Sequence, residues 1–234
     1  MNADRSKVFS RFQLRPDEGP ELYQPHKSMV LIGLNVSYRW RYHDLCVFYQ
    51  AIASRISDDK RTLDTFVSEH KAQAQADTAD EWTAVQQSRL REQIYIRDIE
   101  IRNMEAYADQ LFMVGLWALV EQQIAKTLVE AERVLLPGKA STTSHRWNTL
   151  SKRFESLGID FTKLKSFDGT NEARVLNNKI KHSGLVDVEL GAFGRFQHLV
   201  GTNIDQIDLA LQHYADCTFE FVGHLQETTD GILA

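Results

Sequence analysis

Apolar residues recur every three or four positions along much of this chain, which is the spacing of one face of an α-helix. Two stretches carry the pattern most clearly. The first runs through Leu111, Val114, Ala118, Ala125, Leu128 and Leu135. The second runs through Ile204, Ile207, Leu211, Tyr214, Thr218, Phe221, Val222 and Leu225. Each stretch predicts a helix that packs one face against other helices.

Helix-breaking residues are rare in the first half of the chain. Residues 26–136 contain no proline and only two glycines, whereas proteins of strands and turns need such residues far more often. We therefore expect helices near residues 28–56, 60–76 and 79–135, with a further possible break near Asn103. Ser57-Asp-Asp-Lys is the predicted stop and restart, and Thr78-Ala-Asp-Glu81 fits a capping box.

Residues that end or begin helices are easier to recognise in the second half of the chain. Leu136-Pro-Gly-Lys is a loop, after which Ser144 is expected to cap a helix that Gly158 ends. Asp168 or Thr170 is the expected cap of the next helix. Residues 184–201 contain four glycines, which indicates a loop or a small hairpin.

Domain organisation follows from these elements. Three of the four prolines lie within the first 25 residues, so residues 1–27 are predicted to form an extended or poorly ordered arm. Residues 28–234 are predicted to form a single helical domain. Of the 234 residues, 43% are hydrophobic and 25% are charged, which is ordinary for a globular protein. The expected fold class is all-α, with long antiparallel helices.

Several classes of protein are disfavoured. No apolar run is long enough to cross a bilayer, and the N-terminal residues lack the apolar segment of a signal peptide, so a cytoplasmic protein without membrane contact is expected. Cys46 and Cys217 lie far apart and have no metal-ligand spacing. The chain contains no glycine-rich phosphate loop and no Gly-x-Ser-x-Gly. Neither a metal nor a cofactor is expected.

Positive charge is concentrated in one region although the net charge is −5. Residues 144–182 contain eight Lys or Arg against four acids, whereas residues 201–234 contain six acids and neither Lys nor Arg. A polyanion would be steered toward the first region, and its binding should weaken with salt. Such a basic stretch is also commonly only a solvated face.

The most informative segment lies within this positive region. Arg174, Asn178 and His182 are spaced i, i+4 and i+8, so a helix places all three on one stripe. Gly184 can end that helix, because glycine adopts the left-handed conformation at no steric cost. A cation, an amide and an imidazole in a row could hold an anion and move protons on a phosphodiester. The alternative is a solvated helix end whose basic residues favour the helix dipole.

The segment from Arg153 to His182, ending in Asn178-Lys-Ile-Lys-His182, resembles the HEPN superfamily of helical bundles. An upstream helix with a glutamate among apolar residues is common there, and Leu119-Val-Glu-Gln-Gln-Ile124 looks like it. Many members are metal-independent RNases of toxin–antitoxin, phage-defence and CRISPR systems. Their signature has four to six residues between an Arg and a His. Here seven residues intervene, and Asn177 stands where an Arg would fit best.

The resemblance implies a set of roles. His182 would be the general acid or base, and Arg174 would hold the phosphate oxygens. Asn178 would orient either the His182 imidazole or the phosphate. Lys179, Lys181 and Asn177 would contact RNA, and Glu121 would support the site by pairing with Arg174 or His182. Family sites usually lie at a homodimer cleft. A protein partner or an antitoxin would also fit.

Two functions are therefore open. One is an RNA-binding, metal-independent endoribonuclease-like protein of a bacterial defence or toxin system. The other is a catalytically inactive HEPN-like bundle that serves as a dimerisation or adaptor protein, and the spacing from Arg174 to His182 divides the two. A cluster of aromatic residues near His43 could stack bases, although such clusters more commonly form a core or a helix–helix interface. Its members are Tyr38, Trp40, Tyr42, Phe48 and Tyr49.

Overall fold

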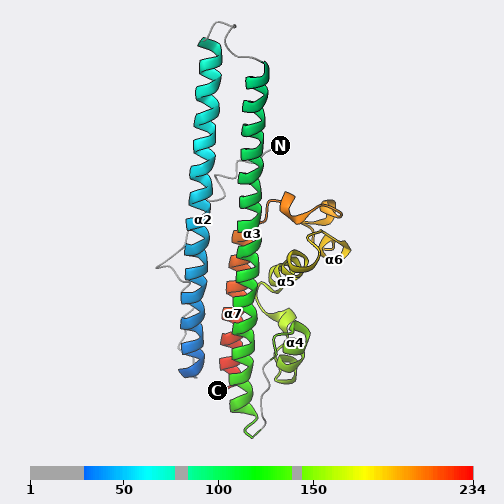
Figure 1. Cartoon of the computed structure of the whole chain (residues 1–234). Coiled ribbons are helices and arrows are strands. Elements are labelled where there is room, and N and C mark those ends of the chain that lie inside the picture. Colours follow the sequence, from blue (N-terminus) through cyan, green and yellow to red (C-terminus); the bar gives the residue numbers. More distant parts are fainter. Residues whose placement is uncertain (1–28, 77–83, 139–143, 234) are drawn as a thin grey trace. The chain divides into compact units, whose positions relative to one another are not determined.

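The computed structural model describes residues 29–76, 84–138 and 144–233, and these residues confirm the all-α fold. They contain no strand, only an isolated bridge between Leu185 and Asn203. The α-helices are α2 (Met29–Ala76), α3 (Ala84–Leu135), α4 (Trp147–Ser156), α5 (Phe167–His182), α6 (Val188–Gly191) and α7 (Leu211–Ile232) (Figure 1). Three short 3-10 turns complete the fold: η1 (Phe161–Lys163), η2 (Gln197–Leu199) and η3 (Ile204–Gln206).

The predicted break at Ser57-Asp-Asp-Lys is wrong, because α2 continues through it. Asp58 and Asp59 do not turn back to cap a new helix. Asp59 pairs with Arg55 at 3.3 Å across one helical turn, and Asp58 pairs with Arg61. Such i,i+3 and i,i+4 pairs stabilise a helix. The two aspartates therefore support the helix that they were expected to end. Likewise α3 runs unbroken past Asn103. The predicted capping box at residues 78–81 lies outside the described residues.

Helix ends in the second half differ from the prediction by a few residues. Helix α4 begins at Trp147, with Arg146 rather than Ser144 at the N-cap, and Gly158 follows its end with a φ of +87° as expected. Helix α5 begins at Phe167, so the predicted caps Asp168 and Thr170 both lie inside its first turn.

The remaining boundaries differ from the prediction because short helices and 3-10 turns occupy segments that were expected to be a loop or part of the last helix. The segment expected as a loop or hairpin over residues 184–201 contains the short helix α6 and the turn η2. Ile204, expected in the last helix, belongs to η3, and Ile207 follows that turn. Helix α7 begins at residue 211 and continues to residue 232, beyond the predicted apolar face.

The described residues fall into two compact units. Unit 1 contains residues 48–76 of α2 and 84–109 of α3. Unit 2 contains residues 29–47 of α2, residues 110–135 of α3, and α4 to α7. The single domain over residues 28–234 stays a prediction, and the predicted arm at residues 1–27 lies outside the described residues.

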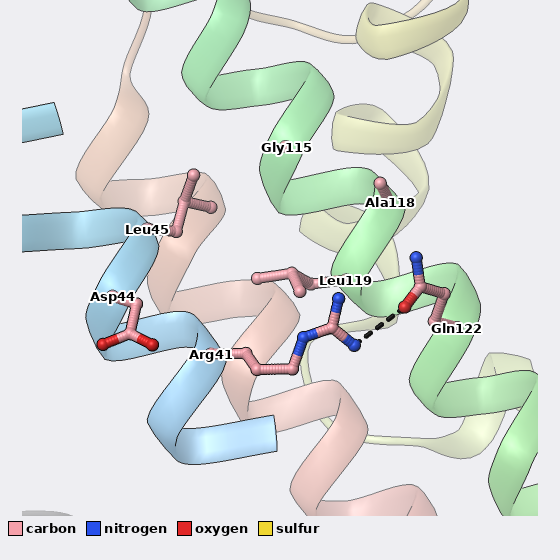
Figure 2. A pocket seen from close by; sticks show the side chains of 7 residues that line it. All are labelled: Arg41, Asp44, Leu45, Gly115, Ala118, Leu119 and Gln122. Atoms are coloured by element: carbon pink, nitrogen blue, oxygen red, sulfur yellow. Dashed lines mark hydrogen bonds between the residues drawn. The ribbon is translucent and has the colours of Figure 1, made fainter. Parts of the chain in front are cut away.

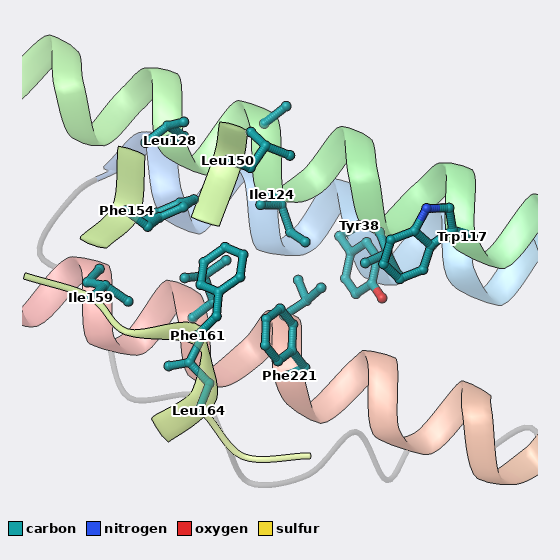
Figure 3. Close-up of a cluster of buried hydrophobic side chains, with 14 residues drawn as sticks. Tyr38, Trp117, Ile124, Leu128, Leu150, Phe154, Ile159, Phe161, Leu164 and Phe221 are labelled. Carbon is teal, nitrogen blue, oxygen red and sulfur yellow. The ribbon is translucent and has the colours of Figure 1, made fainter. Parts of the chain in front are cut away.

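The interior of unit 2 is a cluster of large apolar side chains (Figure 3). The Phe161 ring lies 5.3 Å from Phe154 and 5.4 Å from Phe221, with the second pair edge to face. Aromatic contacts of this geometry add to the free energy gained from buried area. The cluster joins α2, α3, α4, η1 and α7, and its other buried members are Tyr38, Trp117, Val120, Ile124, Ala125, Leu128, Leu150, Ile159, Leu164, Val222 and Leu225.

The predicted face of α3 is confirmed only in part, since Ala125 and Leu128 are buried whereas Val114 and Ala118 are only partly buried. Leu111, at the start of the predicted face, is 63% exposed, and the inward positions are Phe112, Leu116, Val120, Ile124 and Leu128. The segment Leu111–Val120 is apolar on all sides, so spacing alone could not distinguish its two faces. The predicted face of α7 is confirmed from residue 211 onward, where Leu211, Tyr214, Phe221 and Leu225 are buried.

Unit 1 has a smaller interior with few large apolar side chains. Tyr49, Ala53, Ile56 and Ile101 are buried there beside two acids. The acid Asp109 accepts a hydrogen bond of 2.6 Å from the Tyr49 hydroxyl, and Glu105 lies 3.1 Å from the Lys60 ammonium. These partners offset the cost of removing carboxylates from water. Among the described residues, none of the helices combines the length and apolarity that a membrane crossing needs.

Candidate RNA-binding site on α5

Helix α5 places the predicted stripe on one face. It runs unbroken from Phe167 to His182, so Arg174, Asn178 and His182 follow one another at successive turns. Gly184 ends the helix with a φ of +64°, and its N–H donates to the Lys179 carbonyl at 2.8 Å. The predicted helix end is thus confirmed. A β-carbon at that φ would be strained, which explains the glycine.

The opposite face of α5 anchors the helix to unit 2. Ala173, Val175 and Leu176 are buried, and the Thr170 hydroxyl donates to the Cys217 carbonyl of α7 at 3.1 Å. Gly169 is needed at this contact, because a β-carbon there would lie 2.4 Å from the Cys217 sulfur. Close packing at the start of α5 therefore holds the stripe in place.

Arg174 is the central cation of the stripe. Its side chain is half-buried, its Nε donates to Asn171 Oδ1 at 3.0 Å, and its guanidinium carbon lies 5.9 Å from the centre of the Trp147 ring. Burial lowers the pKa of Arg174, and the charge of Glu189 partly opposes that shift. Within the described residues Arg174 forms no salt bridge. The side chain is therefore oriented by an amide and an aromatic ring, both neutral.

Lys179 is held differently, because two acids neutralise it. Its ammonium lies 2.7 Å from Asp187 and 2.5 Å from Glu189, and its side chain is largely buried. Hydrogen bonds to Asp187 and then to Glu189 raise the pKa of Lys179. Asp187 is itself fixed at the start of α6, where it accepts a hydrogen bond from the Leu190 N–H at 3.1 Å. In this arrangement Lys179 is not open to a phosphate.

The position of Asn177 corrects the prediction that this residue contacts RNA, because such a contact requires an accessible side chain. Its exposed fraction is 0%, on the inner face of α5. Neither its carboxamide oxygen nor its nitrogen has a hydrogen-bond partner among the described residues. Asn177 therefore lies beneath the stripe, and RNA cannot reach it in this conformation.

The last turn of α5 is the open part of the stripe. Lys181 and His182 are exposed, and Asn178 is partly exposed. No described residue gives the His182 ring a hydrogen bond or an ion pair. Glu121, on α3, makes no ion pair with Arg174 or His182 in the described structure, so its predicted supporting contact is not observed.

The structure adds four residues that the sequence pattern did not single out. Asn171 and Trp147 orient Arg174, and Asp187 and Glu189 neutralise Lys179. Asn171 precedes Arg174 by three residues, so helical spacing alone could have suggested that contact. Trp147 is remote in the sequence, and the two acids approach Lys179 only because the chain turns back after Gly184.

A groove of about 320 Å³ lies elsewhere in unit 2, between α2 and α3 (Figure 2). Arg41 crosses its mouth and donates to Gln122 Oε1 at 2.8 Å, while Gly115 and Leu45 form part of its wall. None of the stripe residues lines this groove.

The aromatic residues near His43 do not form one cluster in the structure, because some are buried and others are exposed. Tyr38 and Tyr49 are buried, whereas Trp40 and Phe48 are exposed. Tyr38 and Tyr42 both contact Phe219 of α7, with ring centres 5.9 Å and 5.2 Å apart. The inner members therefore belong to the core of unit 2 or to the interior of unit 1, and only the outer members could meet another molecule.

The face of α5 thus offers one oriented guanidinium without a carboxylate partner, a partly exposed amide and an exposed imidazole. This set can bind an anion and can exchange protons with it. No group of three or more His, Cys, Asp or Glu within the described residues could hold a metal ion. Comparison of the chain with protein-family models, with curated proteins and with solved structures gave no match.

Proposed function

We propose that this chain binds RNA through Arg174, Asn178 and His182 of α5 and acts as a metal-independent endoribonuclease. The observation that carries the proposal is the half-buried Arg174 guanidinium, whose direct contacts among the described residues are neutral and for which the charge of Glu189 offsets burial only in part. Removing a cation from water without an anion beside it is costly. A phosphate group would supply that anion and accept paired hydrogen bonds from the guanidinium nitrogens.

The remaining residues have separate roles in this proposal. The ribose 2′-hydroxyl attacks the adjacent phosphorus, forming the O2′–P bond as the P–O5′ bond breaks. His182 acts as the general base that takes the hydroxyl proton or as the general acid that protonates the leaving O5′, with water exchanging the other proton, and Asn178 orients the phosphate or the imidazole. Lys181 attracts the RNA backbone without reading its sequence. The resemblance to HEPN proteins supports a setting in bacterial defence or a toxin system, in which an antitoxin would be the protein partner.

The test uses labelled tRNA and total RNA in the presence of EDTA. We expect cleavage by the wild type that His182→Ala and Arg174→Ala both abolish. Arg174→Ala should also weaken RNA binding roughly ten- to hundredfold in fluorescence anisotropy, because a hydrogen bond to a charged group contributes about 1.5–3 kcal/mol. Lys163→Ala is the matched control, since Lys163 is a highly exposed cation of η1, outside α5.

Unchanged RNA affinity in Arg174→Ala would contradict the proposal. Binding that persists without cleavage, at every ratio of protein to RNA, would retain the binding site and remove the catalytic role.

The second candidate function is a helical adaptor or dimerisation protein without catalysis. Two observations favour it. Asn177 replaces the Arg that the HEPN pattern favours, and it is buried. Trp40 is 65% exposed on α2, and Val36 and Val47 of the same helix are exposed as well. A group of exposed apolar side chains is typical of a surface that binds another protein.

A further inference from the structure

The first part of α2 carries an unpartnered apolar seam. Gly33, Val36, Trp40, His43 and Val47 are spaced by alternating steps of three and four residues, which is the heptad spacing of a coiled coil. Val36, Trp40 and Val47 are exposed, and the Trp40 ring meets His43 edge-on with centres 6.5 Å apart. We name these five residues the α2 seam.

The α2 seam points away from the core of unit 2. The neighbouring positions of α2 face inward: Asn35 Nδ2 donates to Gln226 of α7 at 2.7 Å, and Tyr38 stacks on Phe219. Leu45 packs against Gly115 of α3, where a β-carbon on the glycine would lie 2.9 Å from it. The inward contacts of α2 are thus made by other residues, and the described residues of unit 2 leave Val36, Trp40 and Val47 of the seam exposed.

The two flanks of the seam carry opposite charges. Arg39 lies on the flank toward α7, where its guanidinium carbon is 5.9 Å from the centre of the Phe219 ring. Asp44 lies on the flank toward α3 and lines the groove shown in Figure 2. With Trp40 at heptad position a, Arg39 occupies g and Asp44 occupies e.

We propose that the occupant of the α2 seam is the same seam of a second copy of this chain, in parallel orientation. In a parallel pair, position g of one helix meets position e of the other, so each Arg39 faces the Asp44 of the second copy. In an antiparallel pair g meets g and e meets e, which places like charges together. The surface itself supplies both charges that its partner requires, and this favours a second copy over an unrelated protein.

The seam spans 15 residues, or about 21 Å of helix. An interface of this length is small, so the dimer is reversible and its population rises with protein concentration. The Trp40 side chains contribute most of the apolar area, because an aromatic ring buries more surface than valine or histidine. The inference goes beyond RNA binding and does not depend on the stripe of α5.

The first test is sedimentation velocity of the full chain over a range of concentrations. Wild type is expected to show a monomer–dimer equilibrium, and Trp40→Glu should raise the dissociation constant at least about tenfold. Val188→Glu is the matched control, because Val188 is 80% exposed on α6 and lies outside the seam. Wild type that is monomeric at its highest soluble concentration, or a dimer insensitive to Trp40→Glu, would overturn the proposal.

The second test determines orientation by exchanging the flanking charges. Arg39→Glu and Asp44→Arg should each weaken the dimer, whereas the double variant Arg39→Glu/Asp44→Arg should recover it, since a parallel pair then apposes Glu and Arg. Recovery is not expected for an antiparallel pair, in which the double variant still apposes like charges. Circular dichroism of each variant checks that the helices are retained. Failure of the double variant to recover would refute the parallel arrangement.

Discussion

Units 1 and 2 are both helical, but their interiors are stabilised in different ways. The fully buried aromatic side chains of the described structure belong to unit 2, where Phe161 contacts both Phe154 and Phe221. In unit 1 the interior contains fewer large apolar residues, and it buries Glu105 and Asp109 with polar partners. Apolar packing is gained from any close neighbour, whereas a buried carboxylate requires a particular one. Unit 2 also buries carboxylates, such as Glu172 hydrogen-bonded to Tyr214. Its large aromatic cluster should nevertheless make it the unit more sensitive to lost volume, whereas unit 1, with few large apolar side chains, should depend proportionally more on its hydrogen bonds.

The largest effect is expected from Phe221→Ala in unit 2. Phe221 is fully buried and meets Phe161 edge to face, so its truncation leaves a cavity in the aromatic cluster. We expect the free energy of unfolding to fall by about 3–5 kcal/mol, as measured by urea denaturation. A loss below about 1 kcal/mol would mean that the cluster does not stabilise unit 2 as its packing indicates.

A smaller effect is expected from Tyr49→Phe in unit 1. The change keeps the ring and removes only the hydroxyl that donates to Asp109. The expected destabilisation is about 1–3 kcal/mol, because a buried acceptor loses a partner. Hydrogen exchange of amides in residues 48–76 and 84–109 should rise. The exposed Tyr95→Phe serves as the control for a lost hydroxyl, and equal effects of the two changes would contradict the comparison.

Asn177 is a fully buried polar residue of unit 2 and tests the comparison from the other side. Its carboxamide is buried without a partner among the described residues, so its burial is not offset. Asn177→Leu keeps the branching at Cγ and replaces the carboxamide oxygen and nitrogen with two larger methyl groups. It should stabilise the protein by about 1 kcal/mol in urea denaturation, because it removes a buried polar group that has no partner among the described residues. Destabilisation by this change would indicate that the amide has a polar partner that favours asparagine.

The smallest effect on stability is expected at the pair of Lys179 and Asp187, in which the Lys179 side chain is largely buried and the Asp187 side chain is partly exposed. The hydrogen bond from Lys179, with that from the Leu190 N–H, lowers the pKa of Asp187 below its usual range. Its contribution to stability is present above about pH 4 and is lost as the pH falls through the lowered pKa.

In Lys179→Met, the pKa of Asp187 measured by NMR should rise toward its ordinary value while the urea midpoint near neutral pH changes little. Lys181→Met is the control, since Lys181 is exposed and forms no salt bridge within the described residues. An unchanged pKa of Asp187 in Lys179→Met would show that the ion pair is not formed in solution.

The sequence pattern predicted the helices more successfully than it predicted their limits. Long stretches without proline or glycine predicted α2 and α3, because helix propagation needs only local hydrogen bonds. The break at Ser57-Asp-Asp-Lys failed because the same acids that can cap a helix can also pair with Arg55 and Arg61 along it. Whether these acids cap a helix or form ion pairs along it depends on the residues one turn away. A capping motif by itself does not take those residues into account.

For the candidate site, the sequence by itself determined that Arg174, Asn178 and His182 share a helix face and that the helix ends at Gly184, since helical period and glycine conformation are local properties. Tertiary structure alone decided which cations remain available. Trp147 and Asn171 orient Arg174, the acids after Gly184 neutralise Lys179, and packing of α5 buries Asn177. Burial and charge pairing depend on neighbours from several elements, so no single segment could have shown them.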